Sequence, residues 1–197
     1  MNAERRAWTA APRFQPLLGA AVGAMGAGVY WASAQVWPTS VAVVLSMLAM
    51  AVLSPRMGAA LTEQAASATV LGWVFTVLIK YNALMGLSTA SLPFAVPADV
   101  ALGIFMIAGN AAGRALAVSL KPASHGSLGI ALALGFAPAA LTGVPGLSGL
   151  AAAILGRIAL GAYLRRRRTP VGAAEIDARQ LTEACFYLGA LAARAYI

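Results

Sequence analysis

The sequence is divided into long apolar runs separated by short segments that contain glycine, proline or charged residues. An α-helix needs about 20 apolar residues to cross the roughly 30 Å hydrocarbon core of a bilayer. Only 10% of the 197 residues are charged and 60% are hydrophobic, whereas soluble domains are about 25% charged. A chain of this length could not hide so much apolar surface from water. The pattern therefore predicts an all-α integral membrane protein.

We expect a polytopic bundle of seven transmembrane helices in a single domain, residues 14–197, after a basic cytoplasmic N-terminus, residues 1–13. The expected spans are residues 16–36, 39–54, 68–87, 98–120, 128–141, 149–164 and 176–197. The second and fifth runs are short, so the expected number of spans is five to seven. A Gly/Pro turn, residues 142–148, and a polar link, residues 169–177, flank the sixth span. Gly19 and Gly23 of the first span would let another helix approach closely.

Lysine and arginine fall in alternate connections between these runs. If the N-terminus is cytoplasmic, that side receives nine basic residues: Arg5, Arg6, Arg13, Arg56, Lys121, Arg165, Arg166, Arg167 and Arg168. The opposite connections, residues 36–39, 88–97 and 142–148, contain none. By the positive-inside rule this asymmetry predicts a multi-pass protein of the cell inner membrane, with the arginine cluster 165–168 on the cytoplasmic side. The lipid bilayer is thus the expected partner, and no nucleic acid is expected because no basic face with interleaved aromatic residues exists.

Several polar residues fall inside the expected spans, where they usually face the interior of a bundle. Asn110 and Arg114 are four residues apart, and Gln180 and Glu183 are three apart, so each pair shares one face of a helix. An ion pair between Glu183 and Arg114 would satisfy both charges. Lys80 stands in the last third of its span, where snorkelling to the interface is one interpretation. The buried polar residues either stabilise the bundle or form a polar active site, and no soluble-enzyme motif decides between the two.

Four segments together suggest a family. Residues 14–37 begin with an F-x-P-L-x-G-like entry into a membrane helix, and residues 68–84 end in LIKYNAL. Residues 108–120, AGNAAGRALAVSL, are similar to an A-G-H-x-x-S-R pattern, and residues 179–183, RQLTE, stand where a Q-Q-L-x-E element is expected. In this order the segments resemble the cobalamin synthase family, the adenosylcobinamide-GDP ribazoletransferases, over residues 14–193.

The resemblance implies an enzyme at the cytoplasmic face that joins adenosylcobinamide-GDP to α-ribazole or its phosphate, releasing GMP, with Mg²⁺ as cofactor. It implies the site residues Glu63, Asn110, Arg114, Gln180 and Glu183, with Glu63 as the metal ligand. The family's acidic loop, H-E-D-G-L-A-D-T-A-D-G, corresponds to residues 54–67, SPRMGAALTEQAAS, where Glu63 is the acidic residue.

The loss of the other carboxylates of that loop leaves two hypotheses open. The chain is either a ribazoletransferase or a non-catalytic relative that acts as a membrane scaffold or assembly subunit for other membrane proteins. A small transporter is a third and weaker interpretation, because no repeat symmetry supports it.

Overall fold

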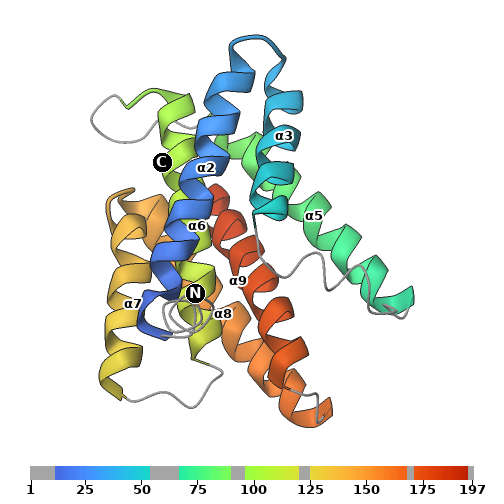
Figure 1. Ribbon diagram of the computed structural model, residues 1–197, viewed down its shortest axis with the longest axis vertical. Helices are drawn as coiled ribbons and strands as arrows, with labels where there is room; N and C mark the ends of the chain where they lie inside the picture. Colours follow the sequence, from blue (N-terminus) through green and yellow to red (C-terminus); the bar gives the residue numbers. More distant parts are fainter. Residues whose placement is uncertain (1–11, 54–66, 90–95, 120–124, 168–170, 195–197) are drawn as a thin grey trace, which may run out of the picture.

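The computed structural model describes residues 12–53, 67–89, 96–119, 125–167 and 171–194. Within them, seven α-helices follow a short 3-10 turn, η1 (Pro12–Phe14) (Figure 1). The helices are α2 (Gln15–Ala34), α3 (Thr39–Val52), α5 (Ser67–Leu87), α6 (Ala98–Val118), α7 (His125–Ala140), α8 (Val144–Arg167) and α9 (Val171–Arg194). Each of the seven apolar runs thus corresponds to one helix, which confirms the predicted all-α bundle.

Three of the described helical segments are long and apolar enough to cross a membrane by themselves: Gln15–Ala34, Ala98–Val118 and Val144–Tyr163. The apolar segments Thr39–Val52, Val74–Leu87 and His125–Ala140 are shorter. A helix can span a bilayer because it satisfies all its backbone hydrogen bonds internally. Helices of this length and apolarity therefore indicate a helical membrane protein. The seven crossings and the cytoplasmic N-terminus stay predictions of the lysine and arginine distribution.

The largest differences from the predicted helix boundaries lie around the sixth span. Helix α8 begins at Val144 instead of 149, so the predicted turn 142–148 is much shorter. Gly143 has a φ of 69°, which glycine adopts without steric cost, and Pro145 stands in the first turn of α8, where proline is tolerated. Helix α9 begins at Val171 instead of 176, so most of the predicted polar link 169–177 is helical. Helix α8 also continues to Arg167, so the first three residues of the arginine cluster extend the helix beyond the apolar run.

Helix α6 lies at the centre of the bundle, and nearly every residue from Ala101 to Val118 is buried. It packs against α2, α7 and α9. Gly23 of α2 lies against the α6 backbone so closely that a Cβ atom there would stand 2.5 Å from the Met106 carbonyl oxygen. Gly109 of α6 faces α9 in the same way, with a Cβ position 2.6 Å from the Tyr187 ring. The predicted close approach of a second helix to α2 is confirmed, and small residues bring three helices together as in other membrane bundles.

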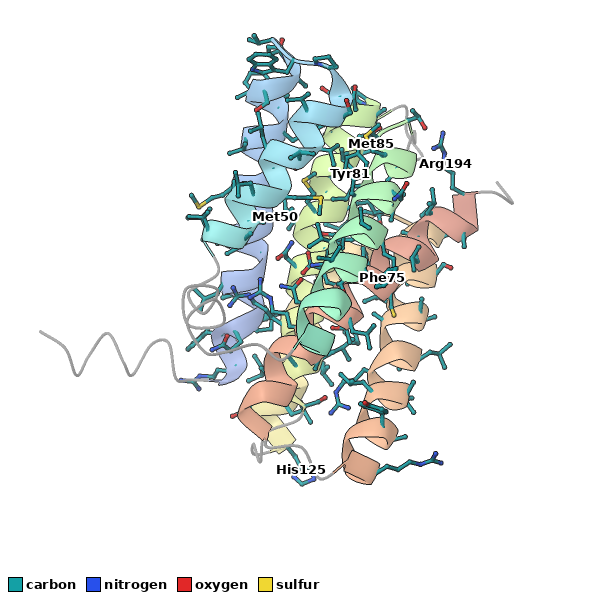
Figure 2. The ribbon with its side chains drawn as sticks, turned by 90° about the vertical axis from the view of Figure 1, so that its right-hand side faces the viewer. Met50, Phe75, Tyr81, Met85, His125 and Arg194 are labelled. Atoms are coloured by element: carbon teal, nitrogen blue, oxygen red, sulfur yellow. The ribbon has the colours of Figure 1, made fainter. Side chains whose placement is uncertain are left out.

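Helices α3 and α5 complete one side of the bundle. Helix α3 packs on α2, and α5 packs mainly on α9 (Figure 1). The end of α5 is attached to the end of α9 by Arg194, which lies beside Met85 and the last turn of α5 (Figure 2). The Arg194 guanidinium donates to the carbonyl oxygens of Gly86 and Thr89 and, at 2.7 Å, to Thr89 Oγ1. Backbone carbonyls at the C-terminus of a helix lack the hydrogen bonds that carbonyls of the helix interior receive. Arg194 supplies donors to such carbonyls and so connects the end of α9 to the end of α5.

Candidate functional site

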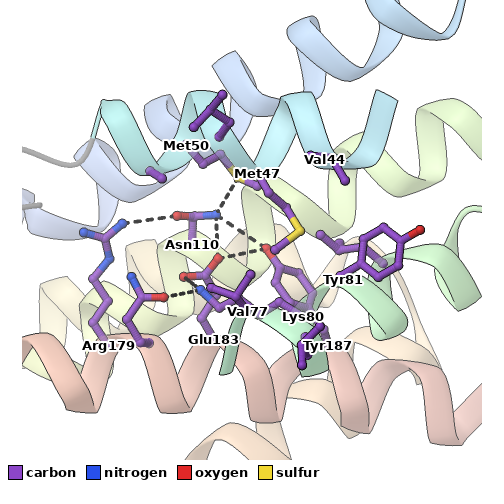
Figure 3. Close-up of a pocket in the computed structure, with 15 residues that line it drawn as sticks. Val44, Met47, Met50, Val77, Lys80, Tyr81, Asn110, Arg179, Glu183 and Tyr187 are labelled. Atoms are coloured by element: carbon purple, nitrogen blue, oxygen red, sulfur yellow. Dashed lines mark hydrogen bonds and ion pairs between the residues drawn. The ribbon is translucent and has the colours of Figure 1, made fainter. Parts of the chain in front are cut away.

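A cavity of about 450 Å³ lies where α3, α5, α6 and α9 meet (Figure 3). Its walls from α3 and α5 are almost entirely apolar, and its polar side chains come from α5, α6 and α9. The lining residues are Val44, Met47, Leu48, Met50, Ala51, Val77, Leu78, Lys80, Tyr81, Leu84, Asn110, Arg179, Gln180, Glu183 and Tyr187. The site therefore combines the apolar wall of two helices with a polar floor from three.

The carboxylate of Glu183 is the centre of the polar floor. Its residue on α9 is only 3% exposed. Glu183 Oε2 lies 2.8 Å from Lys80 Nζ, and Oε1 accepts hydrogen bonds from Asn110 Nδ2 at 3.1 Å and from the Tyr187 hydroxyl at 3.2 Å. A buried carboxylate is tolerated only when it is paired and hydrogen-bonded. Both oxygens of Glu183 meet that condition through three different side chains.

Lys80 is the cation that pairs with Glu183, which corrects the predicted Glu183–Arg114 ion pair. The Lys80 residue is 7% exposed, so its side chain points into the bundle and does not snorkel to the interface. Its ammonium also donates to Gln180 Oε1 at 2.5 Å. Lys80 thus joins α5 to two residues that lie about one turn apart on the same face of α9.

Asn110 connects α6 to the same cluster. It is 1% exposed, and besides its bond to Glu183 its Nδ2 donates to the carbonyl oxygen of Met106, one turn earlier on its own helix, at 3.2 Å. Its Oδ1 accepts a hydrogen bond from Arg179 Nη2 at 3.4 Å. The amide of Asn110 thus uses both its nitrogen and its oxygen in hydrogen bonds, and these bonds orient the side chain toward α9.

Arg114, another predicted site residue, does not join this cluster. Arg114 is buried on α6, but its Cδ lies 2.9 Å from the place where a Cβ of Gly19 would stand. Its side chain therefore runs along α2, and it is not among the residues that line the cavity. Glu63 lies outside the described residues. Of the five predicted residues, the structure brings together Asn110, Gln180 and Glu183.

Three side chains that take part in the polar cluster are not among the predicted site residues: Lys80, Arg179 and Tyr187. Arg179 and Tyr187 stand four residues before and four residues after Glu183, and that spacing places them on its helical face. The signal for both was thus present in the sequence. Lys80 stands out in the sequence as a cation within an apolar span, but its partners on α9 lie about a hundred residues away in the chain, so spacing could not identify them.

The described residues do not match the donor set that Mg²⁺ requires. Mg²⁺ prefers an octahedral set of oxygen ligands, with one or two carboxylates among them. No group of three or more His, Cys, Asp or Glu side chains occurs in the part of the chain that the structure describes. The carboxylate that faces the cavity, Glu183, has both oxygens engaged by Lys80, Asn110 and Tyr187. The described residues of this cavity therefore do not form a Mg²⁺ site.

The charges and surfaces of the cavity define what it can hold. Two cations, Lys80 and Arg179, stand against one carboxylate, Glu183, and the amide groups of Asn110 and Gln180 add hydrogen-bonding capacity. The opposite wall, from α3 and α5, offers aliphatic side chains, thioethers and the Tyr81 ring. Such a cavity fits a molecule with an apolar body and a polar end.

Comparison with curated proteins gives a relative for nearly the whole chain. A protein of Leptothrix cholodnii named adenosylcobinamide-GDP ribazoletransferase is 34% identical over an alignment of 224 residues. The alignment covers 93% of this chain and 85% of the relative. No family model matches the sequence, and no solved structure matches it.

Proposed function

This chain belongs to the adenosylcobinamide-GDP ribazoletransferase family, and from that premise we propose that it acts in late cobalamin biosynthesis. The proposed reaction transfers the cobinamide phosphate moiety of adenosylcobinamide-GDP to α-ribazole and releases GMP. The observation that carries the proposal is that the similarity extends over 93% of the chain.

The cavity residues suit a reaction between a diphosphate and a hydroxyl group. A hydroxyl oxygen of α-ribazole attacks the phosphorus of the cobinamide phosphate and releases its proton to solvent, and the bond from that phosphorus to the oxygen of GMP breaks. Fixed cations and hydrogen-bond donors stabilise the charge that develops in such a transition state. Arg179 and Lys80 supply the positive charge nearest the cavity, and the amide groups of Asn110 and Gln180 orient polar atoms of the substrates.

The location follows from the topology predicted by the basic residues. We place the protein in the inner membrane, with the substrates reaching the bundle from the cytoplasmic side where the arginine cluster 165–168 lies. Glu63 stays the proposed ligand for the Mg²⁺ that the family resemblance implies.

A second candidate function is a non-catalytic relative that serves as a membrane scaffold or assembly subunit. The ion pair of Glu183 favours this candidate. The Glu183 carboxylate faces the cavity, but Lys80 neutralises its charge at 2.8 Å. It is also favoured by residues 54–67, where Glu63 is the one acidic residue in place of the family's acidic loop. In this case the cavity would bind a cobalamin precursor or stabilise the fold without turnover.

Complementation separates the two candidates. The chain is expressed in a strain that lacks its cobalamin synthase, and the corrinoids are quantified. Cobalamin production supports the ribazoletransferase. If the protein is present in the membrane and only adenosylcobinamide-GDP accumulates, the non-catalytic relative is supported, and purification in a gentle detergent then tests for its membrane protein partners.

A further inference from the structure

Helix α8 continues past its apolar part into a turn of arginines. The apolar part, Val144–Tyr163, has 20 residues, which at 1.5 Å per residue gives a length of about 30 Å, the thickness of the hydrocarbon core. The helix then continues to Arg167, and these further residues add about 6 Å. The headgroup layer on each side of the core is about 5–7 Å thick. The length of α8 therefore matches a helix whose last turn lies among the lipid headgroups.

The end of α8 carries an excess of positive charge. The sequence of the helix includes four arginines and neither aspartate nor glutamate. The nearest acidic residues that follow in the chain are Glu175 and Asp177 in the first turns of α9, which begins at the same end of the bundle (Figure 1). Residues 165–177 contain four arginines against these two acids, a net charge of +2. Basic clusters directly after a membrane helix attract anionic lipids.

Arg157 places a fixed guanidinium just before this last turn. Its Nε donates to the carbonyl oxygen of Leu116 at 3.2 Å, in the last turn of α6. Its Nη1 lies 2.8 Å from where a Cβ of Gly161 would stand, so the side chain extends one turn along α8 toward the arginines. The guanidinium is thus held between two helices, a kind of basic pocket in which membrane proteins bind lipid headgroups. Its planar fork of N–H groups also suits the oxygens of a phosphate.

The face of α8 that leads to the arginines is exposed and apolar. Leu155 is 66% exposed and Ile158 is 60% exposed, and their spacing places them on one face of the helix. Arg166, which is also exposed, lies about three turns after Leu155 on that face. Tyr163, 54% exposed, stands between the apolar and the basic part, where aromatic residues of membrane proteins gather. One face of α8 therefore offers a surface for acyl chains and cations for a headgroup.

We propose that the end of α8 is a binding site for an anionic phospholipid. The lipid phosphate binds Arg157 and the arginines of the last turn, and an acyl chain lies along Leu155 and Ile158. A zwitterionic lipid brings a positive group that the arginines repel, and inorganic phosphate gains nothing from the apolar face. The site does not depend on the proposed function, because none of the residues that line the polar cavity belongs to α8.

The test measures equilibrium binding of radiolabelled lipid to the full chain in detergent micelles, with phosphatidylglycerol as the anionic probe and phosphatidylcholine as the zwitterionic probe. The α8 variant carries Arg165→Gln, Arg166→Gln and Arg167→Gln, which keep good helix formers at these positions. An arginine near a membrane surface contributes about fivefold to the affinity for anionic lipid. We therefore expect the α8 variant to bind phosphatidylglycerol about tenfold or more weakly than the wild type does, and the wild type to prefer phosphatidylglycerol to phosphatidylcholine by a similar factor.

The matched control removes three charges from the same predicted side of the membrane, with Arg5→Gln, Arg6→Gln and Arg13→Gln. It has the same net charge as the α8 variant, and we expect it to keep the affinity for phosphatidylglycerol within about threefold of the wild type. Circular dichroism checks that both variants are helical. A second measurement needs no variant: sodium chloride is expected to weaken phosphatidylglycerol binding to the wild type, because salt screens exposed charges.

Four results would overturn the proposal. The first is phosphatidylglycerol binding that the α8 variant leaves unchanged. The second is an equal loss in the control, which would show that only the net charge of the chain attracts the lipid. The third is displacement of the lipid by an equal concentration of inorganic phosphate, which would make this a site for soluble anions. The fourth is binding to the wild type that does not depend on salt.

Discussion

The buried ion pair between Lys80 and Glu183 gives a quantitative prediction about stability. Replacing Lys80 by Met leaves the Glu183 carboxylate in the bundle with only Asn110 and Tyr187 as donors. Replacing Glu183 by Gln leaves the Lys80 ammonium with neutral amide oxygens, such as that of Gln180, as its acceptors. Each single variant therefore leaves a buried charge without its counter-charge. The double variant leaves neither charge.

The magnitude follows from the geometry of the pair. Two unit charges 2.8 Å apart attract by about 6 kcal/mol at an effective dielectric constant of about 20. The cost of removing two ions from water offsets much of that attraction, so a buried pair contributes little compared with two apolar groups. Removing one partner alone is different, because the remaining ion keeps its desolvation cost, and such variants lose about 3–5 kcal/mol. We expect each single variant to lose this amount and the double variant to lose less than the sum by about 2 kcal/mol or more.

The assay is reversible unfolding of the full chain in mixed micelles with increasing SDS, followed by circular dichroism. The free energy of unfolding is compared for wild type, Lys80→Met, Glu183→Gln and the double variant. Asn82→Ala is the control, because Asn82 is exposed on the same helix and bonds only to the carbonyl oxygen of Leu78 within that helix. It is expected to change stability by less than about 0.5 kcal/mol. Single variants that each lose less than about 1 kcal/mol and add without coupling would refute the assigned ion pair.

Three further predictions test the packing, the helix connection and the topology. Gly23→Ala is expected to destabilise the bundle by about 1–3 kcal/mol, because its Cβ meets the α6 backbone. Gly28→Ala on the same helix, where a Cβ meets nothing within 4 Å, is expected to be neutral or stabilising, and equal losses in thermal denaturation would contradict the packing. Arg194→Ala is expected to increase hydrogen exchange in the last turn of α5 but not in α2, and unchanged exchange would show that its hydrogen bonds do not hold that turn. Cysteine placed at Ser91 is expected to react with an impermeant reagent from outside the cell and cysteine at Thr169 is not; the reverse pattern would refute the orientation.

The helices could be predicted from the sequence because apolar length is a direct consequence of the bilayer's thickness. The helix boundaries around α8 could not be predicted in this way, because they depend on the helix preferences of individual proline and arginine residues and not on hydrophobicity. The glycines and proline of residues 142–148 favour a turn, but Pro145 also suits the first turn of a helix. Arginines at the end of α8 are good helix formers, so the helix continues after the apolar run has ended.

The candidate site could be predicted in part. Gln180, Glu183 and Asn110 were assigned to inward helical faces by their spacing, and the structure brings them together. The predicted partner of Glu183 is wrong because several cations, Lys80 and Arg114 among them, lie within the expected spans. Choosing between them requires knowing which helices are neighbours. Helix α5 packs on α9, and Arg114 is directed along α2, so the pair forms with Lys80.

The central claim, that this chain joins adenosylcobinamide-GDP to α-ribazole, is tested most directly by the reaction itself. Membranes from a strain lacking its own cobalamin synthase, with this chain expressed, are supplied with both substrates, and the corrinoids and GMP are measured by mass spectrometry. We predict a cobalamin product and an equal amount of GMP, neither of which forms in membranes without the chain. Recovery of both substrates unchanged, with the folded protein present in the membrane, would contradict the claim.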